Sequence, residues 1–187
     1  MTRNIFGRKA LIAAAAALMM AAIPATETFA QQASQQEEIA KTTIVKVGDK
    51  APDFTVEMID GSSMTLSQLK SKVVVVNFWA TWCPPCREEL KHVQAEIIDR
   101  FKGDKFVFLP ISRGEAAKTV KAFLEKAGYK FPVGLDPKQA IYKLFASNYI
   151  PRNFVVDKKG NIAYLSVGYD EKEFAELIET VAAELKK

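Results

Sequence analysis

The only two cysteines of the 187-residue chain, Cys83 and Cys86, are separated by Pro84-Pro85. Two thiols at this spacing can close a disulfide and can open it again by exchange with a second disulfide. Because such a bond closes almost no loop, it restricts the unfolded chain little and is a poor structural cross-link. The pair therefore indicates redox chemistry at sulfur more than structural stabilisation.

The residues around the pair predict a strand before it and a helix after it. The apolar run Val73 to Ala80 is typical of a strand buried on both faces of a sheet. One amphipathic helix is predicted from about Pro84 to Phe101, because apolar residues repeat there at helical spacing. Cys83 then lies at the helix N-terminus, where free N–H groups and the helix dipole favour a thiolate. We therefore predict Cys83 as the nucleophile and the more buried Cys86 as the resolving thiol, which breaks a mixed disulfide.

The two prolines between the cysteines affect the nucleophile. Neither Pro84 nor Pro85 has an N–H group, so two first-turn donors that could stabilise a Cys83 thiolate are missing. We expect the pKa of Cys83 to be depressed less than in strongly oxidising proteins of this chemistry. A less stabilised thiolate makes the dithiol a better reductant.

Elsewhere, hydrophobic periodicity and turn residues predict a mixed sheet with helices on both faces. A hairpin is expected around Asp60-Gly61, between Thr55 to Met58 and Ser63 to Leu66. The later elements are expected in the order strand 106–111, helix 116–127, strand 131–135, a helix from Pro137 to Phe145, a hairpin of 153–157 with 162–165, and a C-terminal helix 174–185. This pattern predicts one α/β domain over residues 44–187.

The first thirty residues have the pattern of a secretory signal peptide. Basic residues precede the apolar segment Ala10 to Ile23, and Thr28-Phe29-Ala30 is a small-x-small cleavage site before Gln31. An uncleaved membrane anchor is the alternative. Removing residues 1–30 takes away three basic residues and Glu27, which lowers the net charge from +4 to +2. Without a basic stripe, nucleic acid is not expected as a partner. Residues 31–43 are polar and predict a flexible leader.

The segment Val76-Asn77-Phe78-Trp79-Ala80-Thr81-Trp82-Cys83-Pro84-Pro85-Cys86 resembles the active site of thioredoxin-fold proteins. Residues 44–187 as a whole are similar to the exported TlpA/ResA-like thiol-disulfide oxidoreductases; the match includes Gly48 to Phe54 and Tyr149 to Asp157. The resemblance implies a thioredoxin fold with an N-terminal β-hairpin and an extra helical insertion. It also implies disulfide-containing protein substrates and a membrane thiol donor, and some members serve cytochrome c maturation. We expect an exported, periplasmic monomer that acts as a reductant without cofactor or metal.

The resemblance also implies roles for residues distant from the cysteines. Pro151 is expected to be a cis proline facing the pair, with Ile150 before it, and the backbone there pairs with substrate. Glu115 matches a glutamate near the cysteines of ResA-like members, and we predict it as their acid/base neighbour. A helix N-terminal carboxylate stabilised by the dipole is the alternative. Asn77 replaces the buried aspartate of thioredoxins and cannot titrate. Trp82, beside the nucleophile, is predicted to meet partner proteins.

Two other functions compete with this interpretation. A thiol peroxidase relative shares the lead-in through Phe54, but the Pro-x-x-x-Thr/Ser-x-x pattern before a peroxidatic cysteine is absent at Cys83. A non-catalytic carrier of metal such as copper is a different class, and the lack of Met or His near the cysteines argues against it. A c-type haem site would need His where Arg87 stands, and a structural zinc site needs four ligands.

Overall fold

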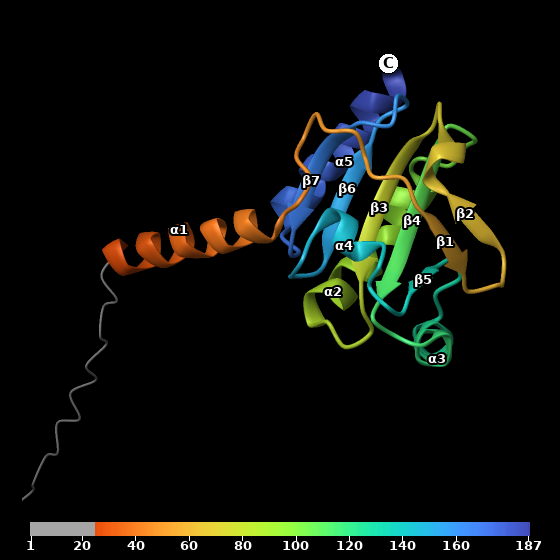
Figure 1. The fold of residues 1–187 in the computed structure, drawn as a ribbon, viewed down its shortest axis with the longest axis horizontal. Helices are drawn as coiled ribbons and strands as arrows, with labels where there is room; N and C mark the ends of the chain where they lie inside the picture. Colours follow the sequence, from red (N-terminus) through yellow and green to blue (C-terminus); the bar gives the residue numbers. More distant parts are fainter. Residues whose placement is uncertain (1–24) are drawn as a thin grey trace, which may run out of the picture.

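The computed structural model describes the backbone of residues 25–187 and the side chains from residue 33 onward (Figure 1). The described helices are α1 (Ala25–Thr42), a 3-10 turn (Leu66–Leu69), α2 (Pro84–Val93), a π-helical segment (Gln94–Asp99), α3 (Ala117–Ala127), α4 (Tyr142–Phe145) and α5 (Glu171–Lys186). The strands are β1 (Thr55–Met58), β2 (Ser63–Thr65), β3 (Val73–Trp79), β4 (Phe106–Arg113), β5 (Gly134–Asp136), β6 (Arg152–Val156) and β7 (Ile162–Val167). Among these described helices, none is long and apolar enough to cross a membrane.

The seven strands form one mixed sheet in the order β2-β1-β5-β4-β3-β6-β7. Strand β3 runs parallel to β4 and antiparallel to β6, and every residue of β3 is buried. Its run of valines is therefore what a central strand covered on both faces requires. The strand that leads to the cysteines is held rigidly between two neighbours, so the turn after it has a fixed position.

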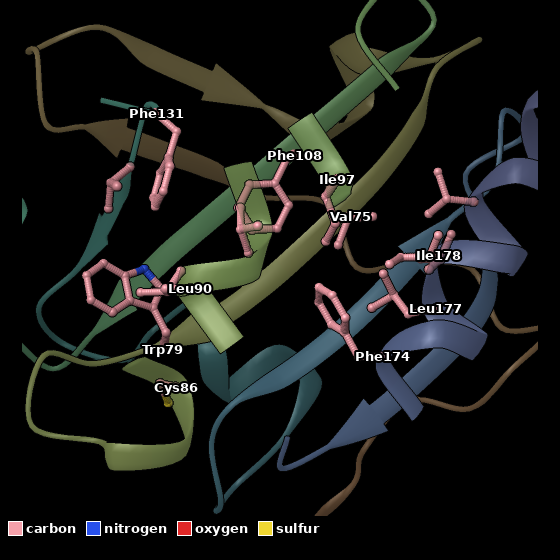
Figure 2. Packing of buried hydrophobic residues seen from close by; sticks show 14 of the residues in the cluster. Val75, Trp79, Cys86, Leu90, Ile97, Phe108, Phe131, Phe174, Leu177 and Ile178 are labelled. Atoms are coloured by element: carbon pink, nitrogen blue, oxygen red, sulfur yellow. The ribbon is translucent and has the colours of Figure 1, made fainter. Parts of the chain in front are cut away.

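Two apolar layers cover the sheet. One contains inward residues of α2, α3 and α5 together with Val73, Val75 and Trp79 (Figure 2). The opposite layer contains Val74, Val76 and Phe78, packed against α4 and the segment before β1. Alternate residues of β3 thus serve opposite layers, as the pleat of a strand dictates. The predicted α/β architecture with helices on both faces is confirmed.

Two predicted helices differ from the observed ones. The helix that starts at Pro84 continues to Asp99, but its last six residues are π-helical. The helix predicted to begin at Pro137 was wrong, because only Tyr142–Phe145 is helical. The carboxylate of Asp136 accepts the backbone N–H groups of Ala140 and Tyr142, and Gln139 has a positive φ of 57°. These two features shape residues 137–141 as a turn.

The segment predicted as a flexible leader, 31–43, lies almost entirely in helix α1 in this structure. Ala, Gln, Glu and Lys dominate this segment, and all four are good helix formers. The predicted signal peptide, residues 1–30, lies mostly outside the described residues and stays a prediction. The end of α1 is attached to the sheet, because the guanidinium of Arg152 donates hydrogen bonds to the hydroxyls of Thr42 and Thr43.

Candidate active site

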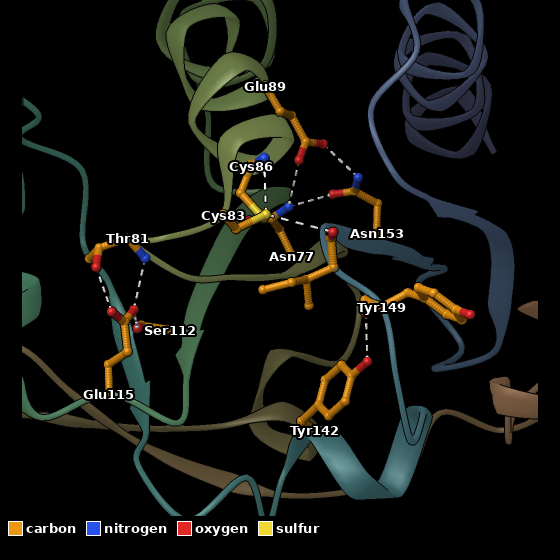
Figure 3. The surroundings of a disulfide bond; sticks show 11 residues. Asn77, Thr81, Cys83, Cys86, Glu89, Ser112, Glu115, Tyr142, Tyr149 and Asn153 are labelled. Atoms are coloured by element: carbon orange, nitrogen blue, oxygen red, sulfur yellow. Dashed lines mark hydrogen bonds between the residues drawn. A yellow bond between two sulfur atoms is a disulfide. The ribbon is translucent and has the colours of Figure 1, made fainter.

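Cys83 and Cys86 form a disulfide at the turn between β3 and α2 (Figure 3). Cys83 is the N-cap of α2, and Pro84 and Pro85 occupy its first two helical positions. Proline fits there because its fixed φ suits the first turn and its missing N–H would have no helical partner. The local sequence therefore places both sulfurs at the helix N-terminus, with the two Cα atoms 5.3 Å apart.

The first backbone N–H of α2 belongs to Cys86, and it donates to Sγ of Cys83 at 3.2 Å. The two prolines supply no donor, as the sequence predicts. Cys86 is completely buried, while Cys83 keeps 3% of its surface exposed. In this disulfide state Cys83 is thus the more exposed residue of the two, and the roles of nucleophile and resolving thiol stay predictions.

The loop before β6 lies against the disulfide. The peptide bond between Ile150 and Pro151 is cis, as the resemblance implies. The carbonyl oxygen of Ile150 lies 3.6 Å from Sγ of Cys83. The preceding carbonyl, of Tyr149, accepts a hydrogen bond of 2.6 Å from the hydroxyl of Tyr142. This bond anchors the loop to α4, beside the sulfur of Cys83.

Exposed aromatic residues adjoin Cys83 in the chain and Ile150 in the loop. Trp82 is 61% exposed and Tyr149 is 38% exposed, although both are large aromatic residues. Ile150 is half-buried and packs against the core. Large exposed aromatic side chains around a reactive group are typical of protein-binding surfaces. The chain beside Cys83 and the loop against the disulfide therefore each carry one exposed aromatic side chain.

A buried polar network occupies the α2 face of the sheet beside the disulfide (Figure 3). One carboxylate oxygen of Glu89 accepts a hydrogen bond of 2.5 Å from the side-chain amide of Asn153, and the other accepts one of 3.2 Å from Asn77. The amide of Asn77 also donates to Oδ1 of Asn153 at 2.8 Å. Strand register brings the two asparagines together, because Asn77 on β3 pairs with Asn153 on β6.

Burial raises the pKa of Glu89 to about 7, and the hydrogen bonds from Asn153 and Asn77 oppose this rise. Burial dominates because Glu89 is only 2% exposed and the described ion pairs include none to it. A carboxyl group that titrates near neutrality can both accept and donate a proton under physiological conditions. Glu89 thus has the acid/base property that was predicted for Glu115.

Sequence reasoning missed Glu89 and Asn153. A signal for Glu89 was present, because it follows Cys86 by three residues and precedes Val93 by four, so all three share the buried face of α2. A carboxylate on an otherwise apolar helix face indicates a functional position. No local signal identifies Asn153, because its partner Asn77 is 76 residues away.

Glu115 lies on the other side of the turn, where it holds the loop before the cysteines. Its carboxylate accepts hydrogen bonds from the backbone N–H and the hydroxyl of Thr81 and from the hydroxyl of Ser112. None of its hydrogen bonds reaches either sulfur, and the N-cap of α3 is Ala116, without a side-chain cap. The contacts therefore favour a positioning role, through Thr81, over both roles considered from the sequence.

The described residues contain no group of three or more His, Cys, Asp or Glu side chains placed to hold a metal ion. What the site does contain is a disulfide at a helix N-terminus, a cis-proline loop against it and a buried carboxyl group beside it. Together with the sheet and its helices, these features define a thioredoxin-fold thiol-disulfide oxidoreductase.

Comparisons with known proteins agree with this class. The Redoxin family model matches residues 46–182. Thiol-disulfide oxidoreductase ResA of Bacillus thuringiensis (strain Al Hakam) is 33% identical over 129 residues, which cover 69% of this chain and 74% of ResA. The chain belongs to the Redoxin family and is similar, within it, to the ResA thiol-disulfide oxidoreductases.

Solved structures give the same result. A protein from Bacteroides thetaiotaomicron, provisionally assigned as a protein disulfide isomerase, has a TM-score of 0.75 and 38% identity, covering 78% of this chain and 94% of that one. A thiol:disulfide interchange protein of the thioredoxin family from Chlorobium tepidum TLS has a TM-score of 0.61 and 30% identity, covering 75% and 98%. The predicted thioredoxin fold is thereby confirmed.

Proposed function

We propose that this protein is an exported reductant of protein disulfides, with Cys83 as nucleophile and Cys86 as resolving thiol. The observation that carries the proposal is the position of the pair: Cys83 at the helix N-terminus beside the cis-proline loop, and Cys86 fully buried behind it. The proposal includes a secretory signal in residues 1–30, a leader in 31–43, and a catalytic domain in 44–187.

The reaction begins with the reduced pair. The Cys83 thiolate attacks one sulfur of a substrate disulfide, and the other substrate sulfur leaves as a thiolate, which takes up a proton. Cys86 then loses its proton and attacks Sγ of Cys83 in the mixed disulfide. The second substrate sulfur leaves, the Cys83–Cys86 disulfide forms, and two electrons have passed from the protein to the substrate.

Glu89 is proposed as the proton acceptor for Cys86. The same helix carries both side chains, three residues apart, and the carboxyl group has a pKa of about 7. Asn77 and Asn153 hold its oxygens by hydrogen bonds, so they act as positioning residues. Trp82, Ile150 and Pro151 are proposed to bind the substrate segment, because the carbonyl oxygen of Ile150 lies 3.6 Å from Sγ of Cys83, Pro151 follows it, and the exposed Trp82 precedes Cys83.

Two features support the reducing direction. Pro84 and Pro85 leave Cys83 with a single helix N–H donor, from Cys86, so its thiolate is stabilised less. The similarity to TlpA/ResA-like proteins also favours a reductant that draws electrons from a membrane thiol donor, and cytochrome c maturation is one process that such a protein serves. The signal-peptide pattern supports a periplasmic or other extracytoplasmic location.

Disulfide reduction by two variants tests this function. The wild-type protein should reduce insulin with dithiothreitol as electron donor, and Cys83→Ser should abolish turnover. Cys86→Ser should instead accumulate a mixed disulfide through Cys83, because the resolving thiol is missing. Trapping with Cys86→Ser in the native compartment, followed by mass spectrometry, would identify the substrates.

Three outcomes would contradict the proposed function or one part of it. If Cys86→Ser traps nothing and Cys83→Ser does, the roles of the two sulfurs are reversed. If neither wild type nor variant exchanges with a protein disulfide, the enzymatic function is refuted. A measured pKa of Cys83 near 3.5, the value of a strong oxidant, would refute the reducing direction.

A further inference from the structure

Two arginines lie on the sheet face opposite to Glu89, and both influence the pKa of Tyr142. Arg113 is the last residue of β4, and its guanidinium carbon lies 4.4 Å from the centre of the Tyr142 ring. Arg152 is the first residue of β6 and is completely buried. Both positive charges influence the Tyr142 hydroxyl, since burial raises its pKa and Arg152 and Arg113 act in the opposite direction. The two guanidinium groups and this hydroxyl therefore form one cluster.

The cluster has more positive than negative charge. The guanidinium of Arg152 donates to neutral acceptors, namely the carbonyl oxygen of Asn148 and two threonine hydroxyls. Asp136 lies on the strand beside Arg113, but its two oxygens accept backbone N–H groups of α4 and the turn before it. Neither arginine has an ion pair among the described residues. One excess positive charge therefore remains here.

Arg113 also has hydrogen-bond donors that the described protein atoms leave unused. Its Nε and Nη1 atoms are buried and have no hydrogen-bond partner. Buried donors of a charged group are costly unless an acceptor meets them. The side chain as a whole stays partly exposed, unlike that of Arg152. Of the two arginines, Arg113 is therefore the one with surface open to a ligand, and because Nε and Nη1 are themselves buried, a carboxylate meets them only when the side chain turns outward.

The cluster adjoins the substrate-binding loop. The Tyr142 hydroxyl donates to the carbonyl oxygen of Tyr149, and the next carbonyl, of Ile150, lies 3.6 Å from Sγ of Cys83. Arg113 is thus one aromatic ring and two peptide units away from the reactive sulfur. The contacts along this path are 4.4, 2.6 and 3.6 Å long, and an extended peptide rises about 3.3 Å per residue, so we place the acidic residue three or four residues from the substrate cysteine.

We propose that Arg113 forms a carboxylate subsite, which binds an acidic side chain of the substrate polypeptide three or four residues from the cysteine under attack. A guanidinium suits this ligand because its N–H groups match the two oxygens of a carboxylate. Arg152 contributes positive charge and holds the loop through Asn148, without touching the substrate. The inference rests on the proposed function, since it assigns a substrate preference to the same site.

Two synthetic peptides test the subsite. Each is closed by one disulfide, and they differ only in having Glu or Gln at the third and fourth residues outside each cysteine. At low ionic strength the reduced wild-type protein should reduce the Glu peptide about fivefold faster, the size expected of a partly exposed ion pair. In Arg113→Gln the rate for the Glu peptide divided by the rate for the Gln peptide should fall to about one. In the wild-type protein, 0.5 M salt should also lower this rate ratio. Lys118→Gln removes an exposed charge from nearby α3 and should keep the full preference.

A second measurement separates the subsite from the reaction. Fluorescence anisotropy with the reduced, alkylated peptides measures binding to the disulfide form of the protein, and the Glu peptide should bind more tightly to wild type but not to Arg113→Gln. Binding without turnover would support the subsite and refute the proposed function. Equal rates and equal binding of both peptides by wild type, or a preference that survives Arg113→Gln, would overturn the subsite. If Arg113→Gln does not fold, Arg113→Lys replaces it and should retain part of the preference.

Discussion

Replacing Glu89 by Gln removes the one described carboxyl group with a pKa raised to about 7. The unfolded chain releases this proton near pH 4.5, whereas the folded chain keeps it until about pH 7. Between these values the unfolded state therefore binds fewer protons, so stability from this group is lost as the pH rises. A difference of about 2.5 pKa units corresponds to about 3 kcal/mol in the free energy of unfolding.

Urea unfolding of the disulfide form from pH 4 to pH 8.5 measures this effect. The free energy of unfolding of wild type minus that of Glu89→Gln should fall by about 3 kcal/mol across the range. Lost hydrogen bonds to Asn77 and Asn153 shift the whole curve by a constant and cancel in the comparison between pH values. The pH dependence of disulfide reduction should also lose a step near pH 7 in the variant.

The adjacent residue gives the matched control. Glu88 is exposed, and a hydrogen bond from Lys91 lowers its pKa, so Glu88→Gln should show a far smaller pH effect of opposite sign. If the difference in the free energy of unfolding between wild type and Glu89→Gln stays constant with pH, Glu89 ionises as easily in the folded protein as in the unfolded chain. Its proposed role as proton acceptor would then be untenable.

Two further variants separate positioning from chemistry. Glu115→Gln should lower the free energy of unfolding by about 1–2 kcal/mol, because one of the three hydrogen bonds from Thr81 and Ser112 loses its acceptor. The pKa of the Cys83 thiol in this variant can be measured from its alkylation rate. An unchanged pKa would support a positioning role for Glu115, and a shifted pKa would restore the acid/base role. Trp82→Ala should lower kcat/KM for insulin about tenfold without changing reaction with a small aromatic disulfide. Val47→Ala, at an equally exposed apolar residue away from the site, should change neither rate.

The local part of this site could be read from the sequence. A β-branched run, two cysteines and a charged helix follow one another within about twenty residues. The strand and the helix differ in the spacing of their apolar residues, and local residues mark where each begins or ends. The failure at Pro137 also has a local cause, because a favourable first helical residue was outweighed by the side chain of Asp136, which caps a turn. Propensity alone does not weigh such a competing hydrogen bond.

The part that could not be predicted depends on register between distant strands. Asn153 meets Asn77 only because β6 pairs with β3 in one particular alignment. A shift of one residue would turn Asn153 to the opposite face and bring Arg152 in its place. No periodicity in a single sequence specifies that alignment, although a buried Glu89 on an apolar helix face signals that polar partners must exist.

The same register divides the site into two halves. Asn153 belongs to the layer that holds Glu89, and Arg152, the residue before it, belongs to the layer that holds Tyr142 and Arg113. The proposed proton acceptor and the proposed carboxylate subsite thus lie on opposite faces of the sheet, and among the described contacts the cis-proline loop adjoins both. Residues in separate networks contribute additively to free energy. If both proposals hold, a substitution at Arg113 should therefore change the preference for substrate charge and leave the proton acceptor Glu89 unaffected.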